Sequence, residues 1–188
     1  MAEPVRRMPR PQRREQILEA ATRAFASAGF AATGLDDVAT EAGITRVILY
    51  RHFDSKTDLY RAVLDRACAR LTDVVGRDDY DEHTLSALVQ AAAADPDGFR
   101  LLFRHAAREP EFRDVTDALA ATSTEVSHRN LTATLPDGPW TRWAARLLPT
   151  LTTEAVIAWL DAGQPDPDQA ADRIAQAVHG VIAAAAQH

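Results

Sequence analysis

The sequence lacks the features that mark secreted and membrane proteins. Its 188 residues include a single cysteine, Cys68, so no disulfide can form within the chain, as suits a reducing compartment. No apolar run approaches the roughly 18–20 residues that span a bilayer. The basic N-terminus is not followed by the apolar segment of a signal peptide. We therefore expect a cytoplasmic protein, with Cys68 as a small, half-buried helix residue or, alternatively, a reactive thiol.

The motifs of β structure and of catalysis are also missing. The chain has no sustained two-residue alternation with β-branched enrichment, and it has no Asn-Gly or Asp-Gly hairpin turn between apolar runs. It has no glycine-rich phosphate loop and no nucleophile elbow. Four of its histidines lack the spacing of metal ligands and are expected in the core or on the surface: His83, His105, His128 and His179. We expect no enzyme, no metal and no cofactor.

The negative net charge of −6 hides an uneven distribution. Residues 1–56 hold nine Arg and Lys against seven Asp and Glu, whereas the remainder holds twelve against twenty. A basic start joined to an acidic body is typical of a protein that meets phosphate at one end only. The alternative is that the N-terminal arm is merely solvated and disordered.

The residues that are present predict an all-α fold of about nine helices. Alanine is abundant, and Pro and Gly occur at intervals that separate helices. The first helix should bury Ile17, Leu18, Ala21, Phe25 and Ala28 and end at Gly29. The expected helices span about 17–28, 35–41, 45–53, 55–75, 85–94, 97–109, 111–135, 140–162 and 168–187. Pro149 should kink or divide the penultimate helix.

The same pattern predicts four regions along the chain. Residues 1–12 form a basic flexible arm that contains Arg6, Arg7 and Arg10, and residues 13–55 form a small helical domain. A connecting helix, 56–77, begins at the N-cap Ser55, with Asp58 as its capping-box partner. The acidic run 78–82 marks the start of a larger domain, 78–188, although it could also be the acidic first turn of a helix.

Residues 35–53 have the pattern of a helix-turn-helix. Gly43 tolerates the positive φ of the turn between two short helices. The expected small core consists of Val38, Ala39, Ala42, Ile44, Leu49 and Phe53. The outer face and ends of the second helix then carry Thr45, Arg46, Val47, Ile48, Tyr50, Arg51 and His52. Arg46, in the first turn, is placed to contact base edges, whereas Tyr50, His52 and Lys56 can reach phosphate oxygens.

Residues 14–63 resemble the N-terminal domain of the TetR (tetracycline-repressor-like) regulators. The matching elements include Gln16-Ile17-Leu18, Gly29-Phe30, Ala42-Gly43-Ile44-Thr45, Leu49-Tyr50, His52-Phe53 and Ser55-Lys56. The resemblance implies that Tyr50, His52 and Lys56 contact phosphates and that residues around Thr45, Arg46 and Ile48 face the operator. It also implies a dimer built from the last two helices and a ligand cavity in the C-terminal domain.

The sequence departs from the family pattern at three places. Two hydroxyl residues usually precede the first helix of the motif, but here Thr33, a candidate DNA contact, is followed by Gly34. One phosphate contact is therefore lost. Val47 and Ile48 replace smaller residues and favour apolar contact with thymine methyl groups.

Two further sets of residues are candidates for assembly and ligand binding. The last helix is apolar over more than one face, which predicts a homodimeric four-helix bundle, with a monomer as the alternative. Its expected interface residues are Ile174, Val178, Val181 and Ile182. Aromatic residues of the larger domain could line a ligand cavity or belong to the core, and the candidates are Phe99, Phe103, Trp143 and Trp159.

Together these patterns predict a DNA-binding transcriptional regulator. We expect a repressor that binds a palindromic double-stranded operator and is released by a small-molecule effector. The alternatives are a ligand-independent regulator controlled by its abundance and, from another class, a small helical enzyme.

Overall fold

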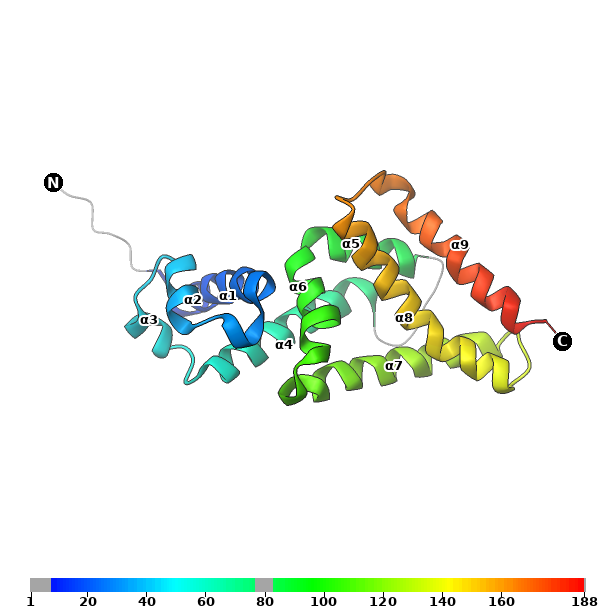
Figure 1. The fold of residues 1–188 in the computed structure, drawn as a ribbon, viewed down its shortest axis with the longest axis horizontal. Helices are drawn as coiled ribbons and strands as arrows, with labels where there is room; N and C mark the ends of the chain where they lie inside the picture. The colour runs from blue at the N-terminus through cyan, green and yellow to red at the C-terminus, as the bar shows by residue number, and fades with distance from the viewer. Residues whose placement is uncertain (1–7, 77–82, 188) are drawn as a thin grey trace. The chain divides into compact units, whose positions relative to one another are not determined.

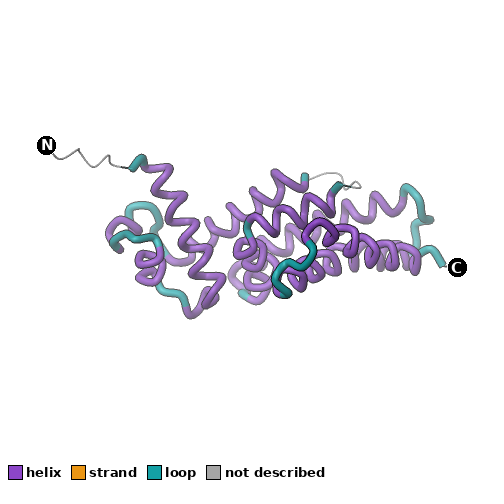
Figure 2. Tube along the Cα trace, turned by 90° about the horizontal axis from the view of Figure 1, so that it is seen from above, coloured by secondary structure: helices purple, strands orange, loops and turns teal. Residues whose placement is uncertain are grey.

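The computed structural model describes residues 8–76 and 83–187. Within these ranges it contains nine α-helices and no strand, which confirms the all-α prediction (Figures 1 and 2). The chain divides into two compact units, Met1–Arg66 and Ala67–His188. This division falls inside the predicted connecting helix. The acidic run 78–82, the expected boundary, lies outside the described residues.

The first unit packs two short helices and parts of the chain's longer helices around one core. It contains α1 (Arg10–Ala32), α2 (Leu35–Glu41), α3 (Arg46–Tyr50) and the start of α4 (Lys56–Val75). Fully buried side chains from all four helices meet there, among them Ile17, Phe25, Val38, Leu49, Leu59 and Tyr60. The rings of Phe25 and Tyr60 lie edge to face, with centroids 4.8 Å apart. Burial of these apolar side chains stabilises α2 and α3, which are too short to be stable alone.

The helix limits differ from the predicted ones at several ends. The first helix begins at Arg10, inside the expected flexible arm, and Gly29 interrupts it with a φ of 78° rather than ending it. Because the chain turns at Gly29, Ala28 is exposed and does not continue the buried stripe. The limits of α2 agree with the prediction, whereas α3 is confined to Arg46–Tyr50.

The start of α4 confirms the predicted N-cap Ser55, but Asp58 accepts from Asp54 instead of closing the capping box on Ser55. The backbone N–H of Asp58 donates to Ser55 Oγ over 3.0 Å, and the Asp58 carboxylate accepts from the backbone of Asp54 over 3.2 Å. Leu59 and Val63 are buried in the first unit. Beyond the division, Leu71 is only half-buried.

The second unit contains the remaining helices (Figure 1). They are α5 (Thr84–Ala94), α6 (Pro96–Arg100), α7 (Arg113–Thr132), α8 (Pro139–Asp161) and α9 (Pro167–Ala185). One core cluster joins α5, α6, α8 and α9 around Phe99, Ile157 and Ile174. A second cluster joins α7 and α8 to the end of α9 around Leu131, Ala144 and Ala185.

The structure differs from the predictions for this unit at two places. The expected helix 97–109 is broken into α6, a π-helical turn (Leu101–His105) and a 3-10 turn (Ala106–Arg108). A further 3-10 turn (Pro110–Phe112) precedes α7. Pro149 lies inside α8 but does not divide it, so that part of the prediction is wrong. The helix packs in the Leu131 cluster before the proline and in the Phe99 cluster after it.

No helix in the described ranges combines the length and apolarity that a membrane span requires.

Candidate nucleic-acid interface

The turn between α2 and α3 has the backbone that a helix-turn-helix needs. Gly43 has a φ of 63°, and the backbone N–H of Ile44 donates to the Ala39 carbonyl over 2.9 Å. The side chain of Gln16, from α1, donates to the Ala42 carbonyl over 2.8 Å. This contact fixes the turn to α1. Sequence reasoning found Gln16 only as part of the family pattern, because a bond across 26 residues leaves no local signal.

The two helices are held by the small core that the sequence predicts. Val38, Ala39, Ala42, Leu49 and Phe53 are buried, and Ile44 is half-buried. Because α3 directs Leu49 inward, its opposite side is left to solvent. The first unit therefore presents a short helix on a rigid support.

The outer face of α3 carries most of the predicted contact residues. Thr45, Arg46 and Arg51 are exposed, as are Val47, at 63%, and Tyr50, at 44%. Ile48 is half-buried, so less of its side chain is available to a base than the sequence suggests. An aliphatic residue as exposed as Val47 has no packing role in the chain and is free to contact a partner.

Arg46 is held in one orientation by three contacts. Its Nη1 lies 2.9 Å from Asp36 Oδ2, and its Nη2 donates to the Tyr50 hydroxyl over 3.2 Å. The guanidinium also lies over the Tyr50 ring, 5.5 Å from the centroid. The hydrogen bond to Tyr50 and then the charge of Asp36 raise the pKa of Arg46 above its ordinary value, so the side chain remains a cation.

His52 lies close to the basic start of α1. Partial burial, followed by the charges of Arg10, Arg13 and Arg14, lowers the pKa of His52 below its ordinary value. The imidazole is therefore neutral at pH 7 and can donate from one ring nitrogen only. Arg6 and Arg7 of the expected arm lie outside the described residues.

Thr33 takes a different role from the expected one. Its side chain is 2% exposed, and its hydroxyl donates to the carbonyls of Ala24 and Gly29 over 3.2 and 2.7 Å. The hydroxyl satisfies backbone oxygens at the interruption of α1. It is not available to a phosphate in this structure.

Lys56 is also engaged within the unit. Its Nζ donates to the Phe30 carbonyl over 2.8 Å and lies 3.4 Å from the Ala31 carbonyl. It also lies 4.4 Å from the centroid of the Phe30 ring. The carbonyls at the end of a helix have no partner within it, so the Lys56 ammonium caps α1.

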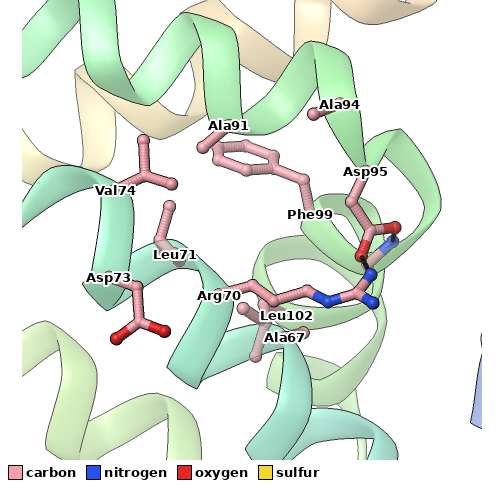
Figure 3. Close-up of a pocket in the computed structure, with 11 residues that line it drawn as sticks. Ala67, Arg70, Leu71, Asp73, Val74, Ala91, Ala94, Asp95, Phe99 and Leu102 are labelled. Atoms are coloured by element: carbon pink, nitrogen blue, oxygen red, sulfur yellow. Dashed lines mark hydrogen bonds and ion pairs between the residues drawn. The ribbon is translucent and has the colours of Figure 1, made fainter. Parts of the chain in front are cut away.

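The second unit contains a cavity of about 370 Å³ between α4, α5 and α6 (Figure 3). Phe99, the one sequence candidate in its wall, points into a lining of small and aliphatic side chains: Ala67, Leu71, Val74, Ala91, Ala94 and Leu102. Arg70 reaches along the wall to Asp95, and the two charges are 3.3 Å apart (Figure 3). The Asp95 carboxylate also accepts from the backbone N–H of Gly98, which caps α6.

The other three aromatic candidates lie elsewhere. Phe103 packs on Phe99, with ring centroids 4.7 Å apart, on the side of the core. Trp159 is buried in the same cluster, and its indole N–H donates to the Pro165 carbonyl. Trp143 is 39% exposed and lies edge to face with Trp140. None of these three residues lines the cavity.

The predicted dimer residues pack within the chain. Ile174 is 7% exposed and belongs to the core cluster with Ile157. Val178, Val181 and Ile182 pack on the cluster of Leu131, Ala144, Ala145, Leu148 and Ala185. Part of the face of α9 that the sequence assigned to a partner subunit therefore packs inside the same chain, while Val178, Val181 and Ile182 remain half-buried. The exposed surface of α9 includes small residues, among them Ala177, Gly180 and Ala184.

In the described ranges, no group of three or more His, Cys, Asp or Glu side chains is placed to hold a metal ion. His128 instead pairs with Asp137 over 3.3 Å.

The comparisons with known proteins agree with this geometry. Residues 17–63 match the family model described as "Bacterial regulatory proteins, tetR family". The transcriptional activator FasR of Mycolicibacterium smegmatis is 37% identical over 107 residues, which are 53% of this chain and 49% of that protein. The regulator TtgR of Pseudomonas putida is 52% identical over 52 residues, 28% of this chain and 25% of that protein. The chain thus spans about half or less of the length of these relatives.

Solved structures share the fold over nearly the whole chain. A TetR-like transcriptional regulator from Rhodococcus sp. RHA1 has a TM-score of 0.78 at 22% identity and covers 89% of this chain and 94% of its own. A TetR-family regulator from Streptomyces coelicolor, SCO4454, has a TM-score of 0.63 at 27% identity, with coverage of 94% and 97%. With the helix-turn-helix, the matching family model and this fold, residues 17–63 form a DNA-binding domain of the TetR family of bacterial regulatory proteins, in a chain that has the fold of TetR-family regulators.

Proposed function

We propose that this protein is a sequence-specific DNA-binding transcriptional regulator. The observation that carries the proposal is the outer face of α3, where Arg46, Val47 and Tyr50 stand exposed on a buried support. Arg46 offers donors to guanine, Val47 offers apolar contact to a thymine methyl group, and Tyr50 and His52 offer donors to phosphates. Such a regulator acts in the cytoplasm, where the DNA is.

The regulator binds as a homodimer to a palindromic operator. A single α3 reaches only a few base pairs, and two copies related by a two-fold axis read two half-sites about 34–36 Å apart. The dimer face lies on the outer sides of α8 and α9. Small residues there, including Ala177 and Gly180, permit the close approach of a second pair of helices.

A small-molecule effector controls release from the operator. The cavity beside Phe99 has the size and apolar lining of a ligand site, and its α4 wall belongs to the helix that begins in the DNA-binding unit. A ligand that favours one conformation of α4 shifts the population of operator-competent dimers. We propose repression as the sign of regulation. Activation is the second candidate, because the relative FasR is named an activator.

Selection of bound duplexes from random DNA tests the proposal directly. The expected result is a palindromic consensus, followed by nanomolar binding of the selected duplex in fluorescence anisotropy. Arg46→Ala should weaken binding by about 1–3 kcal/mol per half-site and relax the choice at one base pair. Arg113→Ala, which removes an exposed arginine of the second unit, is the charge-matched control. Recovery of no consensus would refute the proposal.

A reporter gene that carries the recovered operator separates the remaining alternatives. Repression or activation gives the sign, and a response to added small molecules separates an effector-controlled regulator from one controlled by its abundance.

A further inference from the structure

Asp36 on α2 is exposed and yet has a defined partner. It lies in the first turn of α2, where Asp37, not Asp36, accepts the backbone N–H of the N-cap Gly34 over 2.7 Å. The Asp36 carboxylate instead crosses the turn of the motif to Arg46, at 2.9 Å. Asp36 is therefore not needed to cap its own helix.

The ion pair contributes little to the stability of the fold. The two side chains are 70% and 54% exposed, and exposed pairs contribute little because water screens them and both side chains lose freedom. Moreover, a carboxylate close to the face that meets DNA repels phosphate. The charge of Asp36 in the first turn of α2 suits the helix dipole, but that benefit does not depend on Arg46. The contact with Arg46 itself therefore requires another explanation.

The geometry supplies this explanation. Arg46 is the first residue of α3, and its long side chain would otherwise sample many rotamers. Asp36, on α2, accepts a hydrogen bond from Arg46 Nη1. The Tyr50 hydroxyl accepts one from Nη2, and the guanidinium packs over the Tyr50 ring. Guanidinium has five N–H donors, and these two hydrogen bonds leave three for the edge of a base.

We infer that Asp36 is a specificity-determining positioning residue, which orients the Arg46 guanidinium so that it selects one base pair of the operator. The inference rests on the proposed function. It separates two effects at one position: the carboxylate lowers affinity for all DNA through its charge and sharpens the choice of base through its hydrogen bond.

Two substitutions separate these effects. Asp36→Asn removes the charge but keeps an oxygen that can accept from Arg46, whereas Asp36→Ala removes both. Glu41→Gln is the matched control, since it removes a negative charge from the same helix, from a carboxylate paired with Arg23 rather than Arg46. The probe is the duplex recovered by selection from random DNA, with its single-base variants.

The expected outcome is a loss of base selectivity without a loss of DNA affinity. Asp36→Ala should bind the selected duplex and random duplexes with nearly equal or higher affinity than before, but with discrimination at one base pair reduced about tenfold, within the range that a bidentate guanine contact supplies. Asp36→Asn should keep the discrimination, and Glu41→Gln should keep it as well. A thermal unfolding midpoint equal to that of the wild type shows that folding is unchanged.

A double-substitution cycle connects the effect to Arg46. In the Arg46→Ala background, Asp36→Ala should change no base preference, because the side chain it positions is gone. If the Asp36→Ala protein keeps full base discrimination, the inference is overturned and the proposed function stays intact. The same holds if Asp36→Ala still reduces base discrimination in the Arg46→Ala background. Absence of any sequence preference in the wild-type protein overturns both.

Discussion

Replacing Lys56 with methionine distinguishes a structural role of its ammonium from a role in DNA binding. Methionine keeps an unbranched stem of similar length and removes the charge. In the structure the ammonium donates to the Phe30 carbonyl over 2.8 Å and lies 4.4 Å from the Phe30 ring centroid. Its weaker contact, to the Ala31 carbonyl, is 3.4 Å long. We expect Lys56→Met to destabilise the first unit.

The magnitude follows from these contacts. A hydrogen bond from a charged donor contributes about 1.5–3 kcal/mol, and a partly exposed cation–π contact contributes about 0.5–1 kcal/mol. Lys56 is half-buried, so water replaces part of the lost interaction with the carbonyls. A net loss of about 2 kcal/mol in the free energy of unfolding is the expected result.

Amide hydrogen exchange is the suitable assay. All three tryptophans, Trp140, Trp143 and Trp159, lie in the second unit, so their fluorescence does not report on the first. Mass spectrometry of α1 peptides reports on the first unit. A loss of about 2 kcal/mol in the free energy of unfolding accelerates the exchange of amides that open only by global unfolding roughly 30-fold. If Lys56 only caps α1, the Lys56→Met protein should keep the wild-type slope of log DNA affinity against log salt concentration, because no phosphate contact is lost.

Arg51→Met is the reciprocal control. Arg51 is exposed just after α3, so its removal should lower the salt slope by about one per subunit and leave exchange in α1 unchanged. If Lys56→Met instead leaves exchange unchanged and lowers the salt slope, the ammonium serves DNA and the capping role is refuted.

Three further predictions concern the arm, the histidine of the motif and the dimer. Deletion of residues 1–7 removes Arg6 and Arg7 and should make the salt dependence of DNA binding shallower; an equal slope would mean that the arm is only solvated. Because the pKa of His52 lies below its ordinary value and a bound phosphate raises it, DNA affinity should increase as the pH falls below about 6.5. His52→Gln, measured by anisotropy across that range, should flatten this increase. Gly180→Arg, on the outer face of α9, should yield a folded monomer in light scattering, whereas an intact dimer would exclude this face from the interface.

The helix-turn-helix could be predicted because its determinants are local. A glycine with positive φ at position 43 and apolar residues at helical spacing on both sides define the turn and the core within about twenty residues. The same holds for α2, whose limits agree with the prediction, and for the Ser55 cap. In each case the residues that decide the structure are also neighbours in the sequence.

The contacts that the sequence did not reveal join residues that are distant along the chain. Lys56 meets carbonyls about twenty-five positions before it, and Gln16 meets one twenty-six positions after it. The sequence around Lys56 does not distinguish a lysine that caps a helix from one that binds a phosphate. The motif and the family resemblance both predict a phosphate contact, which stays a prediction, and the positions of the atoms add the contacts that cap α1.

The last helix illustrates a second limit, which concerns the identity of a partner rather than its distance. An apolar stripe shows that a face of a helix is covered, but it does not show whether the cover belongs to the same chain or to another copy. Here Ile174 is buried within the chain, whereas Val178 and Ile182 are only half-buried against its own core, so their part in a dimer stays a prediction. We propose that the exposed face of α9 takes part in the contact, because its alanine and glycine residues let two backbones approach closely. A dimer through these residues relies on shape rather than on large apolar anchors, so one long charged side chain there should be enough to separate the subunits.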